Sequence, residues 1–178
     1  MSNKFIILDR DGVINVDLFD YVLEEKTFEF EQGSVNALLK LHKNNFKIIV
    51  VTNQTCINLG LISAQGISDI NNYWIRQIED LGGSILHTEV CPHERSENCG
   101  CRKPATGLLE SAEKKLNINL RGSYFVGDKL SDLECASSYG CKPVLVKTGY
   151  GGMTLSESFP SETKIFENLE EVVNWIVD

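Results

Sequence analysis

The 178-residue sequence lacks a long apolar run, an excess of basic residues and a recognisable leader, and each absence excludes a class of protein. A membrane-spanning helix needs roughly 18 or more apolar residues in succession, so we expect no membrane span. Lys and Arg number 17 against 25 Asp and Glu, which gives a formal charge of −8. Nucleic acids and anionic membranes bind basic surfaces, so we expect neither as a partner. The start of the chain shows no secretory pattern, which predicts a cytoplasmic protein.

The composition that remains is that of an ordinary globular protein, with 42% hydrophobic and 24% charged residues. A chain of this length can bury about two thirds of its unfolded surface, so it needs no disulfide framework. The length and the absence of internal repeats or linkers predict a single domain over residues 1–178. We expect the protein to be a monomer.

Short apolar runs alternate with segments of helical periodicity along the whole chain. The runs predict strands and the periodic segments predict helices: strands at 4–8, 47–52, 84–90, 123–126 and 143–146, and helices at 34–45, 63–81, 106–116, 130–139 and 169–177. This order is typical of an α/β fold with a parallel sheet of about five strands and helices on both faces. The Gly- and Ser-rich segment 149–160 is predicted to be a loop.

Ligands of such sheets bind beyond the carboxyl ends of the strands, so the residues after each strand are the candidate site. Asp9 and Asp11 follow the first strand within an Asp-Arg-Asp-Gly run. One acid can serve as nucleophile or metal ligand while the other transfers protons. The alternative is a solvated turn, because Asp and Gly are also turn residues.

Three further groups of polar residues follow later strands. Hydroxyls and amides, from Thr52 to Thr55, suit phosphate oxygens, although the same residues also form turns. The adjacent cations Arg102 and Lys103 suggest anion binding, or a solvated basic pair. Asp128, within Gly-Asp-Lys-Leu-Ser-Asp, can complete a Mg²⁺ site with the first two acids, and Lys147 lies past the fifth strand, within possible reach.

Four metal-ligating residues lie in the eleven-residue loop 91–101: Cys91, His93, Cys99 and Cys101. Three thiolates and one imidazole form a closed tetrahedral set, which is typical of a structural rather than a catalytic zinc site. The alternative is incidental cysteines beside a surface histidine. Because Arg102 and Lys103 follow the last ligand directly, we expect the zinc to fix these cations against the substrate.

Taken together, the acids after strand one, Thr52, Lys103 and the Gly-Asp-x-x-x-Asp run resemble the haloacid dehalogenase superfamily of phosphotransferases. The resemblance implies a Rossmann-like sheet with a minimal cap and a Mg²⁺-dependent phosphomonoesterase that works through an aspartyl-phosphate. It implies that Asp9 attacks phosphorus and Asp11 transfers protons, while Thr52, Asn53 and Lys103 hold the phosphoryl oxygens. Mg²⁺ would lie on Asp9, Asp128 and the backbone carbonyl of Asp11.

Within the superfamily, the run 9–15, Thr52-Asn53-Gln54, the Cys/His loop and the run 126–132 resemble the heptose-1,7-bisphosphate 7-phosphatases. This subfamily supplies heptose for lipopolysaccharide or other surface glycans. The expected substrate contacts are Asp17, Tyr21, Gln54, Thr55, Arg102, Lys129 and Lys147. The alternatives are a histidinol-phosphate phosphatase, which shares the first motif and the zinc loop, and a zinc-stabilised binding module without turnover. Cys56 and Leu59 stand where the subfamily usually has Gly and Arg, a departure that bears on the substrate and leaves the residues of phosphoryl transfer unchanged.

Overall fold

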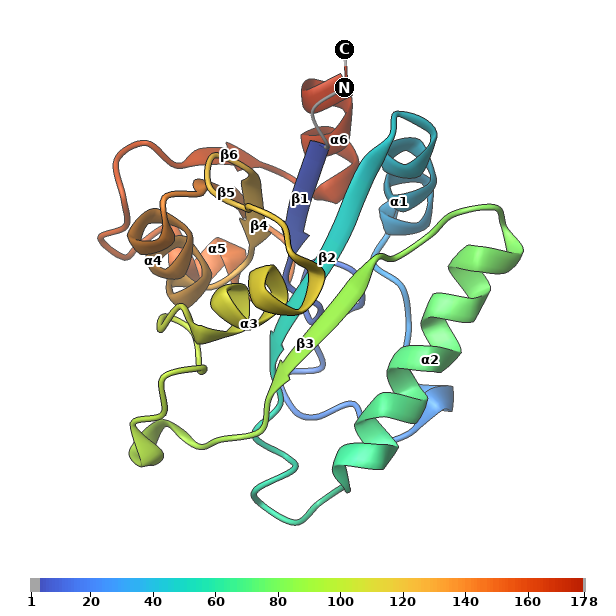
Figure 1. The fold of residues 1–178 in the computed structure, drawn as a ribbon, viewed down its shortest axis with the longest axis vertical. Helices are drawn as coiled ribbons and strands as arrows, with labels where there is room; N and C mark the ends of the chain where they lie inside the picture. The colour runs from blue at the N-terminus through green and yellow to red at the C-terminus, as the bar shows by residue number, and fades with distance from the viewer. Residues whose placement is uncertain (1–3, 178) are drawn as a thin grey trace.

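The computed structural model describes residues 4–177 and has six parallel strands in one sheet, with the order β3-β2-β1-β4-β5-β6 (Figure 1). The strands are β1 (Lys4–Leu8), β2 (Phe46–Asn53), β3 (His87–Cys91), β4 (Tyr124–Gly127), β5 (Lys142–Val146) and β6 (Lys164–Phe166). The central strands consist of apolar, mostly β-branched side chains, because both faces of a parallel sheet are covered by helices. This confirms the predicted fold class.

Two hydrophobic cores lie on opposite faces of the sheet, as the pleat requires. Ile6 and Leu8 of β1 pack into one core, and Ile7 between them packs into the other. The helices on the face of Ile6 are α1 (Ser34–Lys43), α2 (Ala64–Asp80) and α6 (Leu169–Val177). Those on the face of Ile7 are α3 (Gly107–Leu116) and α4 (Leu130–Tyr139), on the opposite side of the sheet in Figure 1.

Helix ends follow the capping residues in the sequence. The Ser63 hydroxyl accepts a hydrogen bond from the Gly66 N–H at 3.0 Å and begins α2, as predicted. The Asn168 side chain accepts one from the Glu171 N–H at 3.0 Å and begins α6. Each cap satisfies a backbone donor that the first turn of a helix leaves without an intrahelical partner.

The structure corrects the sequence-based prediction in the C-terminal part of the chain. The sheet has six strands rather than about five, because the three-residue β6 pairs with β5 at the sheet edge. Two of its residues, Lys164 and Ile165, are exposed, so no buried apolar run marks this strand in the sequence. The segment 149–160 is not a loop throughout, because it contains the four-residue helix α5 (Gly151–Thr154). A third difference is that β3 begins at His87 rather than at residue 84.

The strand order reverses between β1 and β4, and the carboxyl ends of these two strands form the switch point of the sheet. The connections at this end are loops with the single-turn helices η1 (Glu25–Thr27) and η2 (Arg95–Glu97). No separate lid domain is inserted between the strands of the described chain, which agrees with the expected minimal cap. Over residues 4–177, no helix is long and apolar enough to cross a membrane.

Candidate active site and metal centre

Three buried carboxylates converge at the switch point: Asp9 after β1, and Asp128 and Asp132 after β4. Each offers an oxygen, and these three oxygens all lie within 4.8 Å of one another. Asp9 is fixed at the strand end, because its N–H donates to Val126 O at 2.9 Å and its Oδ1 accepts from the Arg10 N–H at 2.7 Å. Asp132 was part of the sequence motif but was not among the predicted site residues.

Two lysines neutralise part of this negative charge. The buried Lys103 Nζ lies 2.9 Å from Asp9 Oδ1 and 2.6 Å from Asp132 Oδ1, and it also donates to Val51 O at 2.9 Å. Burial opposes the charge of Lys103, but the two carboxylates outweigh it and raise its pKa. Lys129 Nζ lies 3.4 Å from Asp128 Oδ2 and 2.8 Å from Asp17 Oδ2.

The two lysines do not fully compensate the negative charge of the three acids. Burial raises the pKa of Asp9 to about 6, although Lys103 opposes the shift. Burial also raises the pKa of Asp128 well above its usual range, and Asp132 and Asp9 add to the effect. Buried carboxylates this close together require a compensating cation, and oxygen ligands are those that Mg²⁺ prefers. The donor set therefore fits a magnesium ion.

Two glycines allow the chain to close around Asp128. A Cβ atom at Gly12 or at Gly149 would overlap the Asp128 carboxylate, and both residues have a positive φ, of 82° and 54°. The Tyr150 N–H donates to Asp128 Oδ2 at 2.8 Å, and the Thr154 hydroxyl donates to Asp128 O at 2.8 Å. Helix α5, which the sequence did not predict, thus supports a member of the acidic cluster.

The carboxylate of Asp11 lies outside the cluster of three acids. It forms a salt bridge of 2.9 Å with Arg10 and accepts hydrogen bonds from Asn15 Nδ2 at 3.0 Å and Gln54 Nε2 at 2.7 Å. Burial would raise the pKa of Asp11, but these partners lower it below its ordinary value. The structure therefore holds the carboxylate of Asp11 apart from the three clustered acids, in bonds to Arg10, Asn15 and Gln54.

The polar run after β2 connects the other parts of the site. Thr52 is buried, and its hydroxyl accepts from Gln54 Nε2 at 2.8 Å. Asn53 Oδ1 accepts from the Lys103 N–H at 3.1 Å, and Asn53 Nδ2 donates to Lys103 O at 3.3 Å. These paired bonds hold the segment before α3 against the end of β2, which brings Lys103 to Asp9.

A cavity of about 440 Å³ opens beside Asp11 to the solvent. It brings together six of the seven predicted substrate contacts, namely Asp17, Tyr21, Gln54, Thr55, Arg102 and Lys129. Lys147 does not line it, because its ammonium pairs with Glu167 at the surface. Leu59 does not line it either, and its side chain is exposed.

No pattern in the sequence indicates the aromatic pair that lines this cavity. The rings of Phe19 and Tyr150 lie 4.9 Å apart between centroids, and both residues line the cavity. The Phe19 N–H donates to Asp17 Oδ1 at 2.8 Å, so Asp17 links the loop to Lys129. Asp17 therefore acts on the shape of the cavity as well as on its charge.

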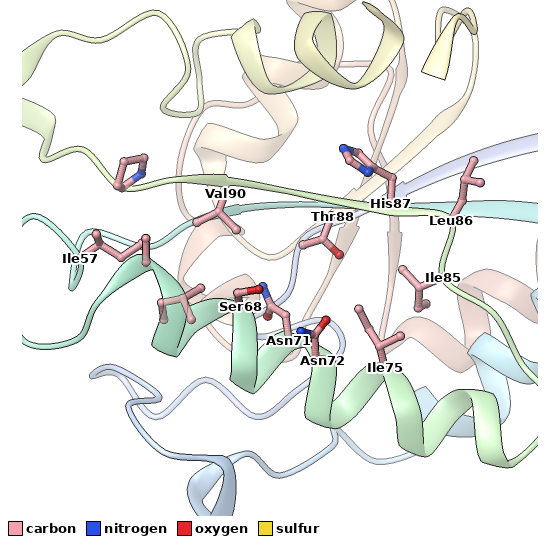
Figure 2. Close-up of a pocket in the computed structure, with 13 residues that line it drawn as sticks. Ile57, Ser68, Asn71, Asn72, Ile75, Ile85, Leu86, His87, Thr88 and Val90 are labelled. Atoms are coloured by element: carbon pink, nitrogen blue, oxygen red, sulfur yellow. The ribbon is translucent and has the colours of Figure 1, made fainter. Parts of the chain in front are cut away.

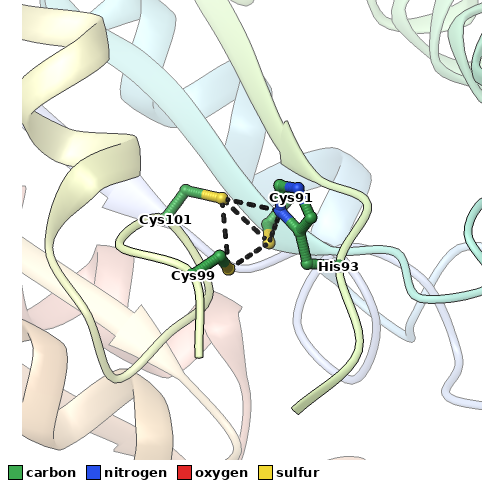
Figure 3. Close-up of side chains that lie close together, drawn as sticks. All are labelled: Cys91, His93, Cys99 and Cys101. Atoms are coloured by element: carbon green, nitrogen blue, oxygen red, sulfur yellow. Dashed lines mark hydrogen bonds between the residues drawn. The ribbon is translucent and has the colours of Figure 1, made fainter. Parts of the chain in front are cut away.

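The Cys/His loop brings its four predicted ligands together, as Figure 3 shows. The three distances between pairs of Sγ atoms are 3.2–3.7 Å. Those from His93 Nδ1 to the Sγ atoms of Cys91 and Cys101 are 3.6 and 3.2 Å. Two ligands of a tetrahedral zinc with Zn–S bonds of about 2.3 Å lie roughly 3.8 Å apart, so the cluster is close to that geometry. Desolvation opposes ionisation of Cys99, but the N–H groups of Arg102 and Cys101 donate to its sulfur and lower its pKa to about 7.

Arg102 connects this loop to the cavity. Its N–H donates to Cys99 Sγ at 3.3 Å, while its guanidinium Nη1 donates to Thr55 Oγ1 at 2.7 Å and to His93 O at 3.0 Å. The guanidinium is thereby directed to the cavity wall. A metal bound by the loop would fix the backbone that positions this cation.

Comparisons with known proteins agree with this geometry. The HAD-hydrolase-like family profile matches residues 100–172, the part that carries Lys103, Asp128 and Asp132. The chain is 37% identical to the D-glycero-beta-D-manno-heptose-1,7-bisphosphate 7-phosphatase of Pseudomonas putida, over 98% of this chain and 99% of the relative. It is 34% identical to the corresponding alpha-anomer phosphatase of Photorhabdus laumondii, over 93% of this chain and 91% of the relative.

A solved structure shares the fold over nearly the whole chain. The crystal structure of D,D-heptose 1,7-bisphosphate phosphatase from Bordetella bronchiseptica, complexed with magnesium and phosphate, superposes with a TM-score of 0.93. Its sequence is 33% identical, and the match covers 97% of each chain.

Proposed function

The chain belongs to the family of haloacid dehalogenase-like heptose-1,7-bisphosphate 7-phosphatases, and on that premise we propose that it removes the 7-phosphate of D-glycero-D-manno-heptose 1,7-bisphosphate. The observation that carries the proposal is the cluster of Asp9, Asp128 and Asp132 around Lys103 at the switch point. Phosphate monoesters hydrolyse very slowly without a catalyst, so an enzyme needs several charged groups directed at one phosphoryl group. This cluster supplies them.

In the first half-reaction, a carboxylate oxygen of Asp9 attacks phosphorus and the bond from phosphorus to the sugar oxygen breaks. Asp11 gives its proton to the departing oxygen, which leaves as the hydroxyl of the sugar. Lys103 and the polar groups of Thr52 and Asn53 hold the phosphoryl oxygens. The products of this step are the dephosphorylated sugar and a phosphoryl group on Asp9.

In the second half-reaction, water attacks the phosphorus of the aspartyl-phosphate and Asp11, now ionised, accepts its proton. The bond from phosphorus to Asp9 breaks, which releases phosphate and restores the carboxylate. The lowered pKa of Asp11 favours the ionised carboxylate from which this step begins. A bound Mg²⁺ supplies Lewis-acid neutralisation of the phosphoryl charge, and Asp9, Asp128 and the Asp11 carbonyl are its proposed protein ligands, with Asp132 beside them.

The four residues Cys91, His93, Cys99 and Cys101 are proposed to hold one structural zinc ion. Their sulfur and nitrogen atoms leave no position for water or substrate, so the role of the ion is to stabilise the loop. The ion would order the backbone up to Arg102 and Lys103 and thereby hold two cations at the site.

Arg102 is the proposed contact for the distal phosphate at C1, because Lys103 lies beside Asp9 and serves the reacting phosphoryl group. Lys147 is no longer a candidate for this contact, since it pairs with Glu167 away from the cavity. The sugar would lie between these two ends, against Tyr21 and the pair of Phe19 and Tyr150. The two similar phosphatases are named for opposite anomers, so both anomers are included in the test.

The test measures phosphate release from a panel of esters: both heptose bisphosphate anomers, histidinol phosphate and p-nitrophenyl phosphate. We expect the highest kcat/KM for a heptose bisphosphate and no turnover by Asp9→Asn, whose amide cannot attack phosphorus. A preference for histidinol phosphate would overturn the substrate, and turnover by Asp9→Asn would overturn the covalent mechanism. Size-exclusion chromatography and cell fractionation check the further proposals that the protein is a monomer and acts in the cytoplasm in heptose supply for surface glycans.

A further inference from the structure

Arg10, between the two acids of the first motif, is a completely buried cation. Its guanidinium donates to Asp11 through Nη2, at 2.9 Å to Oδ1 and 3.1 Å to Oδ2. On its other side, Nη1 donates to Asn71 Oδ1 at 3.3 Å. The three nitrogens of a guanidinium are rigidly coplanar, so a contact at Nη1 restricts the orientation of the edge that holds Asp11.

Asn71 comes from α2, 61 positions along the chain from Arg10, and is itself buried. Its Oδ1 also accepts from the indole Nε1 of Trp74 at 3.2 Å. Trp74 is fully buried and stacks on Phe28, with 5.9 Å between ring centroids. The two donors on one oxygen fix the plane of the Asn71 amide, and the packed indole prevents that plane from turning.

The Asn71 side chain also lines a second cavity, of about 410 Å³, between α2 and β3 (Figure 2). Among residues 4–177, both hydrogen bonds of the Asn71 side chain are made by Oδ1, and Nδ2 makes none. Asn72, the next residue, lines the same cavity but is exposed, and its side chain has no hydrogen-bond partner in the described chain. Asn71 thus differs from its neighbour in its bond to Arg10.

We propose that Asn71 is a positioning residue for the reaction, which acts through Arg10 on the carboxylate of Asp11. The inference rests on the proposed function, in which Asp11 transfers a proton to the leaving oxygen. Loss of the Asn71 acceptor leaves a buried N–H of Arg10 unpaired, and the guanidinium reorients to regain a partner. Asp11 moves with it, because three of its contacts are bonds to Arg10.

The test is Asn71→Leu, which keeps a similar branched shape but has no acceptor. A displacement of about 1 Å in a catalytic group can cost roughly 100-fold, so we expect kcat for a sugar phosphate to fall about 10- to 100-fold. The burst rate with p-nitrophenyl phosphate should fall less than about threefold, since a good leaving group needs no proton. KM should not change, because Asn71 does not line the substrate cavity.

Three variants serve as controls. Asn72→Leu makes the same change at the neighbouring position, and we expect wild-type rates with both esters. Asn71→Asp keeps an acceptor for Arg10 and should restore most of the rate with the sugar phosphate. Trp74→Phe keeps the bond from Arg10 to Asn71 but removes the second donor, so it should lower the melting temperature and change the ratio of the two rates in the same direction as Asn71→Leu, but by less.

Equal losses with both esters, or an unchanged ratio, would overturn the proposal and leave Asn71 a structural residue. If Asn71→Leu does not fold, the same ratio is measured for Asn71→Ser, whose short side chain cannot reach Arg10. The NMR resonance of the Arg10 Nε–H gives a readout that needs no turnover. It should shift in Asn71→Leu and not in Asn72→Leu, and an unshifted resonance overturns the inference even if wild type hydrolyses neither ester.

Discussion

Arg102→Ala should impair hydrolysis of the bisphosphate far more than hydrolysis of a small ester. The Arg102 guanidinium lines the substrate cavity and is held there by Thr55 Oγ1 at 2.7 Å and His93 O at 3.0 Å. These bonds order the side chain before substrate binds, so little entropy opposes its contact with a distal phosphate. It is also the cavity cation that is not paired with a carboxylate, since Lys129 pairs with Asp17.

A charge-assisted hydrogen bond contributes about 1.5–3 kcal/mol, which corresponds to roughly a 10- to 150-fold loss of kcat/KM with the bisphosphate. With p-nitrophenyl phosphate, which has no second phosphate, the loss should stay below about threefold, since a surface contact contributes about 0–1 kcal/mol. The assay measures released phosphate for both esters at one pH and ionic strength. Arg95→Ala in the same loop is the matched control, because Arg95 is exposed and does not line the substrate cavity.

Equal losses with the two esters would refute the assignment and place Arg102 at the reacting phosphate. A loss that also appears in Arg95→Ala would instead indicate a general effect on the loop. The melting temperature of Arg102→Ala separates either result from unfolding.

Four further outcomes follow. Elemental analysis should find about one zinc per chain, and Cys99→Ser should lower the melting temperature; a zinc-free protein with an unchanged melting temperature would contradict the zinc site. Gly12→Ala should abolish phosphate release, because its Cβ would overlap the Asp128 carboxylate, and wild-type turnover would show that the loop can move aside. Asp132→Asn should weaken the hold on Lys103 and lower kcat about 10-fold or more, since charge stabilisation is a large term in catalysis; unchanged kinetics would exclude Asp132 from the site. Glu89→Gln should lower the free energy of unfolding at pH 7 by at most about 1 kcal/mol, because burial opposes the lowered pKa of Glu89 and its partner Lys115 is largely exposed. The difference should vanish in acid, where the wild-type carboxyl is protonated, and a difference that persists there would refute the ion-pair explanation.

The fold could be predicted from the sequence where burial leaves an apolar pattern. The strand at 4–8 appears where an apolar run predicts it, and the helix capped by Ser63 is long enough to show its period. β6 escaped prediction because an edge strand of three residues buries too little to leave such a pattern. Helix α5 was missed because its glycines favour a loop and only its contacts with Asp128 reveal its role.

The site could be predicted where chemistry requires a residue type directly after a strand. Asp9 is of this kind. Lys103 and the four Cys/His ligands were predicted instead from residue types that cluster in one short segment, and the structure brings each group together. Lys147 shows the limit of this reasoning, because a cation after β5 points to whichever acid is nearer, here Glu167.

Asn71 could not have been found from the sequence. Its connection to Arg10 spans 61 positions and depends on the packing of α2 against the sheet, which no local pattern encodes. The aromatic pair of Phe19 and Tyr150 likewise forms between distant loops.

In the proposed reaction, Asp9 receives the 7-phosphate of the heptose bisphosphate and the 1-phosphate stays in place. The most direct measurement is a phosphorus NMR time course of the wild-type protein with heptose 1,7-bisphosphate and Mg²⁺. We expect the resonance of the primary 7-phosphate to disappear as inorganic phosphate grows, while the anomeric phosphate keeps its intensity. Loss of the anomeric resonance first, or loss of the 7-phosphate resonance at the same rate in Asp9→Asn, would contradict it.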